Sequence, residues 1–279
     1  MSIINETRRI LRAYGITPRK RLGQNFIVEV GVFHRMVSYA RMRGDEVVLE
    51  IGAGLGFLTR LLSERCRRVI AVELDRKLAR ILRNRLSSLR NVTILEGNIL
   101  KLSIPPFSKV VSTPPYSISS PIFFWLLERD FELAILTFQE EFAQRLVAQP
   151  NSKDYSRLTV AAYYRAEVEL LDPVRKDAFW PQPGVDSVIV RLKPKKPPFH
   201  VKDERVFFEL VRALFTQRNK KVKNAIKLFL KRLRLSDREI ADWSSTLPFV
   251  NRRTRELAPE EFGMIANEIA DRMREKGLL

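Results

Sequence analysis

Between residues 47 and 139, short runs of β-branched and other apolar residues alternate with segments whose apolar residues recur at helical spacing. The predicted strands are residues 47–51, 69–74, 92–95, 110–112 and 133–138. The predicted helices include residues 57–64 and 76–86. Strands that alternate with helices in this way indicate an α/β fold with a doubly wound, mostly parallel sheet. Two later β-rich runs, at 159–171 and 187–192, could add an antiparallel edge.

A proline-rich segment, residues 193–198, interrupts this pattern. It reads as a linker, because proline lacks the amide hydrogen that helices and strands need. Beyond it, apolar residues recur at spacings of three and four, as in an amphipathic helix: Val206, Phe207, Leu210, Val211, Leu214 and Phe215. Ser236 and Glu239 could cap the next helix, and residues 257–260 start another. We therefore expect a domain of residues 1–195 and a small all-helical domain of residues 196–279.

The charge balance is strongly basic. Lysine and arginine total 50 against 32 acidic residues, a formal net charge of +18. Such an excess favours nucleic acid as partner, because basic side chains that neutralise phosphates release condensed counterions. A solvated, heat-tolerant surface is the alternative, although ion-pair networks would be closer to balance. An anionic membrane is less favoured, because no segment has the pattern of an interfacial anchor.

Other features of the composition narrow the class further. A single cysteine excludes an internal disulfide framework, and two histidines with one cysteine make a protein-only zinc site unfavourable, so no metal is expected. No apolar run approaches the roughly 20 residues of a membrane span. The N-terminal residues contain no signal-peptide hydrophobic block, so we expect a cytoplasmic protein.

A glycine-rich loop follows the first predicted strand: residues 50–56 read Glu-Ile-Gly-Ala-Gly-Leu-Gly. Dinucleotide-binding folds use G-x-G-x-x-G, whereas the third glycine here comes one residue earlier. A dinucleotide also needs helix N–H groups that bind its phosphates, whereas S-adenosylmethionine contains no phosphate. With the acidic Glu50, the loop fits S-adenosylmethionine better than NAD; a glycine turn without ligand is the other reading.

Polar residues also end the next two strands. Glu73 can accept hydrogen bonds from both hydroxyls of a ribose, as in dinucleotide enzymes. Asp75 is interpreted as a helix N-cap. Asn98 is either a turn residue or a partner of the adenine edge, and the second is favoured because ligands bind at the carboxyl ends of parallel strands.

The fourth strand ends in Thr113-Pro114-Pro115-Tyr116. Prolines present carbonyl acceptors without amides. Acceptors held against an aromatic amine help pyramidalise its nitrogen and direct the lone pair at a methyl donor. Tyr116 offers a face on which an extruded base can stack. A proline turn with a core tyrosine is the alternative.

Taken together, five spaced motifs resemble the ribosomal RNA adenine dimethyltransferase family (the KsgA type). They are residues 23–26 (Gly-Gln-Asn-Phe), 50–54, 72–75 (Val-Glu-Leu-Asp), 115–116 and 179–183 (Phe-Trp-Pro-Gln-Pro). The similarity runs from about residue 19 to 192 and continues weakly through 215–221. It implies a class I, Rossmann-like methyltransferase domain in residues 1–195 and an RNA-binding helical domain in residues 196–279. It also implies methylation of N6 on two adjacent adenosines in a hairpin loop near the 3′ end of small-subunit rRNA.

The resemblance further assigns roles to residues of this chain. Gln24, Asn25 and Ile27 are expected to close over S-adenosylmethionine, and Phe179 to stack on the target base opposite Tyr116. The full set of expected cofactor-binding residues is Gln24, Asn25, Ile27, Glu50, Gly52, Gly54, Glu73, Leu74, Asn98 and Thr113. The expected catalytic residues are Thr113, Pro114, Pro115, Tyr116 and Phe179.

Two positions depart from the family pattern, which has Asn at 113 and Asp at 98. Threonine has a shorter reach and is branched at Cβ, and an amide can donate as well as accept. The second methyl transfer is therefore an open question. One alternative is a ribosome-assembly or RNA-binding factor with weak or only monomethylating activity. Methylation of a large-subunit RNA is another, and a nicotinamide-dependent oxidoreductase is disfavoured by the glycine spacing.

Two acid-free basic clusters are candidates for RNA contact. The first contains Arg8, Arg9, Arg12, Arg19, Lys20 and Arg21. The second contains Arg218, Lys220, Lys221, Lys223, Lys227, Lys231, Arg232 and Arg234. Apolar residues interleaved with the second cluster can face the core and leave its basic side to solvent. We expect these clusters to hold rRNA of an immature small ribosomal subunit by its backbone, with the protein acting as a monomer.

Overall fold

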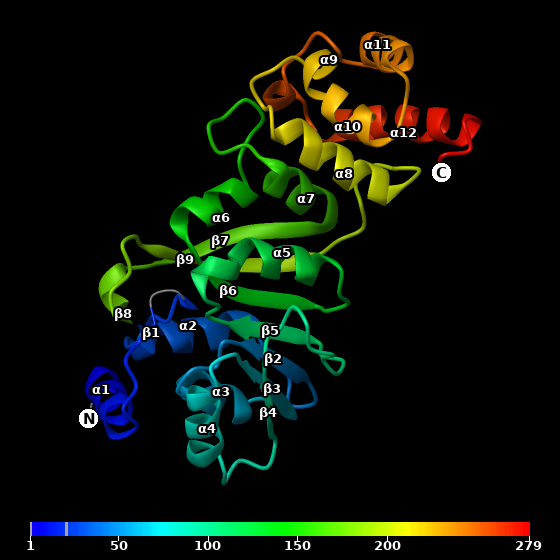
Figure 1. The fold of residues 1–279 in the computed structure, drawn as a ribbon. Coiled ribbons are helices and arrows are strands. Elements are labelled where there is room, and N and C mark those ends of the chain that lie inside the picture. Colours follow the sequence, from blue (N-terminus) through cyan, green and yellow to red (C-terminus); the bar gives the residue numbers. More distant parts are fainter. Residues whose placement is uncertain (1, 20–21) are drawn as a thin grey trace. The chain divides into compact units, whose positions relative to one another are not determined.

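The computed structural model describes residues 2–19 and 22–279, which form two compact units (Figure 1). The first unit comprises Met1–Ala143 and Glu167–Pro194. The second comprises Gln144–Ala166 and Lys195–Leu279. Residues 144–166 precede the predicted boundary at 195 but belong with the helices that follow it, because Tyr155, Val160 and Tyr164 are buried in the same hydrophobic core as those helices.

A seven-stranded sheet forms the centre of the first unit, in the order β4-β3-β2-β5-β6-β9-β7 (Figure 1). Its strands are β2 (Val47–Ile51), β3 (Arg68–Glu73), β4 (Val92–Glu96), β5 (Lys109–Ser112), β6 (Leu133–Gln139), β7 (Ala166–Val174) and β9 (Ser187–Pro194). The first five are parallel, as the sequence predicts. Strands β2, β3, β5 and β6 are almost entirely buried, whereas β4 at the edge is half-buried, as expected when helices cover both faces of a parallel sheet.

The later β-rich runs are confirmed only in part. Strand β9 is antiparallel to β6, with Ser187 opposite Gln139. Residues 157–165, however, form helix α7 (Arg157–Arg165). The strand predicted for 159–171 is therefore wrong for residues 159–165 and confirmed from Ala166 onward. The Ser156 N–H donates to Thr159 Oγ1 (3.1 Å) at the helix start. Val160 and Tyr164, four residues apart, are both buried on one helix face, and this tertiary packing overrides the β propensity.

Within the described residues, six α-helices begin in the first unit. They are α1 (Ile3–Ala13), α2 (Val30–Ala40), α3 (Phe57–Ser63), α4 (Arg76–Arg85), α5 (Ser119–Leu127) and α6 (Glu140–Leu146), whose last residues belong to the second unit. Side chains of α2 and α3 share a hydrophobic core with one face of β2, β3, β5, β6 and β9. A short antiparallel pair, β1 (Phe26–Ile27) and β8 (Phe179–Trp180), lies beside the sheet.

The second unit is helical, as predicted for residues after 195. Its helices are α7, α8 (Glu204–Phe215), α9 (Val222–Ala225), α10 (Lys227–Arg232), α11 (Asp237–Thr246) and α12 (Pro259–Glu275). The capping box of α11 is confirmed: Ser236 N–H donates to Glu239 Oε2 (2.7 Å). Among the described helices, none combines the length and apolarity needed to cross a membrane. Within the same residues, acidic, histidine and cysteine side chains nowhere gather in threes that could hold a metal ion.

Candidate active site

The glycine loop turns sharply at the carboxyl end of β2. Gly52 and Gly54 both have positive φ angles, 77° and 57°, which only glycine adopts without strain. The N–H groups of Gly52 and Ala53 donate to Val72 O (2.8 and 3.1 Å), which draws the loop against the neighbouring strand. A Cβ on Gly54 would lie 3.3 Å from the Phe26 ring. The loop is thus compact, and the missing side chain of Gly54 leaves room for the Phe26 ring.

Glu73, at the end of β3, is held in a fixed orientation. Its two carboxylate oxygens accept hydrogen bonds from Gly54 N and Asp75 N, both at 2.8 Å. Burial raises the pKa of Glu73, and these backbone N–H groups oppose the shift. Each carboxylate oxygen keeps a second acceptor site, so Glu73 can still accept hydroxyl donors from a ligand in the pocket.

Glu50 is the most unusual ionisable group in the site. Its side chain is 2% exposed, and burial raises its pKa to about 8, opposed by the nearby Thr59 hydroxyl and reinforced by Glu73. Among the described residues, no hydrogen-bond donor reaches Glu50 Oε2. A buried acceptor without a donor carries a free-energy penalty, which a cationic ligand group would remove.

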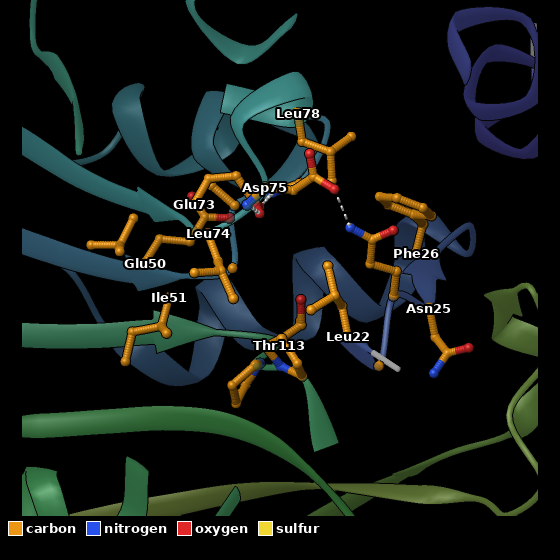
Figure 2. A pocket seen from close by; sticks show the side chains of 18 of the residues that line it. Leu22, Asn25, Phe26, Glu50, Ile51, Glu73, Leu74, Asp75, Leu78 and Thr113 are labelled. Carbon is orange, nitrogen blue, oxygen red and sulfur yellow. Dashed lines mark hydrogen bonds between the residues drawn. The ribbon is translucent and has the colours of Figure 1, made fainter. Parts of the chain in front are cut away.

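Segment 22–27 forms the wall opposite these carboxylates, and Figure 2 shows Asn25 and Phe26 across the pocket from Glu73 and Leu74. Gln24 Nε2 donates to Asp75 Oδ2 (3.1 Å), while Gln24 Oε1 accepts from Arg19 N (2.8 Å). Asp75 also caps α4 by accepting from Lys77 N (2.9 Å), as predicted. Sequence reasoning gave Asp75 only the capping role and missed its bond to Gln24, which no local pattern reveals.

Asn98 stabilises a turn, which is one of the two roles that the sequence allows for it. Its Oδ1 accepts from Leu100 N (3.0 Å), yet the residue also lines the pocket. Since one lone pair of the oxygen is used in the turn, contact with an adenine amine would have to use the other.

The Thr113–Tyr116 segment approaches the glycine loop from the next strand. A Cβ on Gly52 would lie 3.1 Å from Pro115 Cδ. The Tyr116 hydroxyl lies 2.5 Å from Ser187 Oγ on β9, and burial raises the pKa of Tyr116 to about 12. Any bound cofactor at the glycine loop therefore lies directly beside this segment.

Phe179 faces Tyr116 from β8. The two ring centroids are 6.1 Å apart at 67°, an edge-to-face contact, and Phe179 is 4% exposed. The rings pack against each other in this conformation, so a base stacked between them requires one ring to move.

The structure brings the predicted cofactor and target residues into one pocket. The predicted residues that line it are Gln24, Asn25, Ile27, Glu50, Gly52, Gly54, Glu73, Leu74, Asn98, Thr113, Pro114, Pro115, Tyr116 and Phe179. Leu74 is 52% exposed there, which is unusual for a large apolar side chain at a strand end. Lining residues that sequence reasoning missed include Leu22, Phe26, Phe57, Leu78, Ile99 and Thr137. Most are ordinary apolar residues that only the fold brings together.

The predicted RNA-contacting residues have different surroundings. Arg19 forms an ion pair with Asp75 (3.5 Å), and Lys20 and Arg21 lie outside the described residues. In the second unit, Lys220 and Lys221 are exposed and Lys223 is half-buried. The Arg218 guanidinium donates to Ser152 O and Lys153 O, both at 2.7 Å, so part of its hydrogen-bonding capacity is used within the unit. The interleaved Val222, Ile226, Phe229 and Leu230 are buried, and Leu233 is half-buried.

The sequence and the fold of this chain are similar to those of known proteins. Residues 15–246 match the family model described as ribosomal RNA adenine dimethylase. A protein from Methanosarcina acetivorans, described as a probable ribosomal RNA small subunit methyltransferase A, is 45% identical over 95% of this chain and 98% of its own. The crystal structure of a dimethyladenosine transferase from Plasmodium falciparum has a TM-score of 0.75 and 27% identity, over 89% of this chain and 97% of that one. The 23S rRNA methyltransferase ErmE has a TM-score of 0.63 and 28% identity, over 88% of this chain and 99% of its own. The chain has the class I methyltransferase fold and belongs to the ribosomal RNA adenine dimethylase family.

Proposed function

We propose that this protein transfers methyl groups from S-adenosylmethionine to N6 of adenosines, two of them adjacent, in a hairpin loop near the 3′ end of small-subunit rRNA. One observation carries the proposal: the acidic, glycine-lined part of the pocket adjoins the Thr113–Tyr116 segment, with Gly52 against Pro115. A methyl donor and an aromatic amine can therefore meet in one pocket.

The residues of the pocket fit S-adenosylmethionine. Glu73 offers acceptors to the ribose hydroxyls, and the unpaired Glu50 Oε2 offers a buried carboxylate oxygen to the ammonium of the methionine part. When bound, S-adenosylmethionine supplies an electrophilic methyl group on its sulfonium. Gln24, Asn25 and Ile27 would cover this site, and the bond from Gln24 to Asp75 supports that placement.

The target amine would lie at Thr113–Tyr116. The backbone carbonyls of this segment and the Thr113 hydroxyl are acceptors for its N–H bonds, and the ring of Tyr116 is a stacking surface. Phe179 would stack on the opposite side of the base after the two rings separate.

Exposed lysines of the second unit would hold the rRNA backbone, with an immature small subunit as the substrate and the cytoplasm as the place of action. The relatives named for the small subunit favour this RNA over the large-subunit RNA named for ErmE. Thr113 and the engaged oxygen of Asn98 favour one second candidate, an assembly factor that binds the subunit but methylates weakly or only once.

The test is direct. Small subunits that lack the methylation are incubated with the protein and S-adenosylmethionine labelled in its methyl group, and the digested RNA is analysed by mass spectrometry. We expect N6,N6-dimethyladenosine in a fragment from the 3′ hairpin. Tight binding of subunits without any methylated adenosine would refute the enzyme and favour the assembly factor.

A further inference from the structure

Thr137 on β6 has a hydroxyl that the fold leaves without a partner. Its side chain is fully buried, and within the part of the chain that the structure describes no group hydrogen-bonds Thr137 Oγ1. The residue lines the same pocket as Thr113, Tyr116 and Phe179. Burying a polar group is unfavourable unless it finds a hydrogen-bond partner, so this hydroxyl points to a ligand group.

Strand order places Thr137 on the target half of the pocket. Glu50 and Glu73 lie near the ends of β2 and β3, and Asn98 follows β4, so all three are toward one edge of the sheet. Thr113 follows β5, and Thr137 belongs to β6, the next strand on the other side. The β5–β6 register pairs Ser112 with Leu136, so one further residue brings Thr113 beside Thr137.

The position of Tyr116 agrees with this. Its hydroxyl contacts Ser187, which is opposite Gln139 on β6. Thr137 is two residues before Gln139 and therefore shares its face of the sheet. Thr137 thus shares a face of the sheet with Ser187, the contact of Tyr116, and lies beside Thr113 in the strand register.

We propose that Thr137 is a substrate-binding residue whose hydroxyl oxygen accepts a hydrogen bond from the exocyclic amine of the target adenine, beside Thr113. This rests on the proposed function. Each transfer leaves S-adenosylhomocysteine and costs the amine one N–H proton, which is released to solvent, so the monomethylated amine keeps a single N–H. Its hydrogen bond to Thr137 would hold the monomethylated base in place for the second transfer. Loss of this hydroxyl should therefore reduce the dimethylated product most.

The test compares Thr137→Val, which removes the hydroxyl at nearly constant shape, with Thr137→Ser, which keeps it. Thr7→Val is the matched control, because Thr7 is also buried with an unpartnered hydroxyl but does not line the pocket. Single-turnover methylation of unmethylated small subunits is measured with the affinity for S-adenosylmethionine and the melting temperature. We expect Thr137→Val to slow dimethylation by about tenfold, the value of one hydrogen bond, with cofactor affinity and melting temperature maintained. Thr137→Ser and Thr7→Val should stay near the wild-type rate.

Two results would overturn the proposal. A wild-type rate of dimethylation in Thr137→Val would show that the hydroxyl does not contact the substrate. Weakened binding of S-adenosylmethionine with normal transfer at saturation would place it against the cofactor instead. Failure of the proposed function is distinct, because then the wild-type protein itself forms no methylated adenosine.

Discussion

Gly52 and Pro115 approach each other so closely that a Cβ on Gly52 would lie 3.1 Å from Pro115 Cδ. This contact joins the glycine loop after β2 to the target segment after β5. Gly52→Ala would strain the backbone, because φ is 77°, and would also push these two segments apart. We expect a loss of more than about 2 kcal/mol in unfolding free energy and weaker binding of S-adenosylmethionine, measured by denaturant unfolding and calorimetry.

Gly15→Ala separates the two effects. Gly15 has a similar φ of 60°, but a Cβ there would meet no atom within 4 Å. The unfolding free energy of this variant should fall only by the cost of backbone strain, about 1–2 kcal/mol, and the variant should bind S-adenosylmethionine normally. Equal losses of unfolding free energy and equal cofactor affinities for the two variants would show that the contact between Gly52 and Pro115 contributes to neither.

Glu50 should make stability depend on pH in a recognisable way. Burial raises its pKa from 4.5 to about 8, so between these values the folded protein binds a proton that the unfolded chain has released. The free energy of unfolding should therefore fall as the pH rises through this window, with a contribution of up to ~1.4 kcal/mol per pH unit. Glu50→Gln, which has no proton to release, should have a smaller pH dependence and be more stable than wild type near pH 9; Glu73, whose pKa burial also raises, should keep part of the slope.

Urea unfolding at a series of pH values measures this difference. Glu96→Gln is the control, because Glu96 is opposite Glu73 in the register at the end of the neighbouring strand β4, but is exposed. Its profile should follow that of the wild type. A Glu50→Gln profile parallel to the wild type would contradict a protonated Glu50 in the free protein.

The parts of the site that the sequence predicted are those whose chemistry lies in a local pattern. Glu50, Gly52 and Gly54 are close in sequence at the end of β2, and Glu73 is at the end of β3, so the strand order alone brings them to one edge of the sheet. The parallel strands were predictable for a similar reason, since burial on both faces requires continuous apolar runs.

The rest depends on tertiary contacts that no local pattern contains. Thr137 resembles any threonine in a strand until the register with β5 puts it beside Thr113. Residues 157–165 have β-forming composition, yet the core of the second unit makes them helical. The edge-to-face packing of Tyr116 on Phe179 was likewise not predictable, because it depends on how β8 is placed against the sheet.

Thr113→Asn tests whether this residue limits the number of methyl groups. The amide of asparagine reaches farther than a threonine hydroxyl and is not branched at Cβ, so it can orient an amine that already carries one methyl. We expect the ratio of dimethyl- to monomethyladenosine to rise when digested small-subunit RNA is analysed by mass spectrometry. Thr113→Ser, which keeps only the hydroxyl, should stay at or below the wild-type ratio. Complete dimethylation by the wild type, unaltered in Thr113→Asn, would show that Thr113 imposes no limit.

The basic residues before and in α9 should bind RNA through its phosphates. Lys220 and Lys221 are exposed and Lys223 half-buried, while Val222 and Ile226 are buried. Replacing the three lysines by glutamate should leave the fold intact but weaken binding to small-subunit rRNA. Each lost phosphate contact should reduce the slope of log K against log salt by about 0.7–0.9.

The control replaces three exposed basic residues of the first unit by glutamate, which changes the net charge by the same amount: Arg67, Arg90 and Lys101. When binding is measured across a salt series, the slope of log K against log salt should decrease much more for the lysine variant than for this control. Equal slopes for the two variants would mean that net charge alone, not this surface, attracts the RNA.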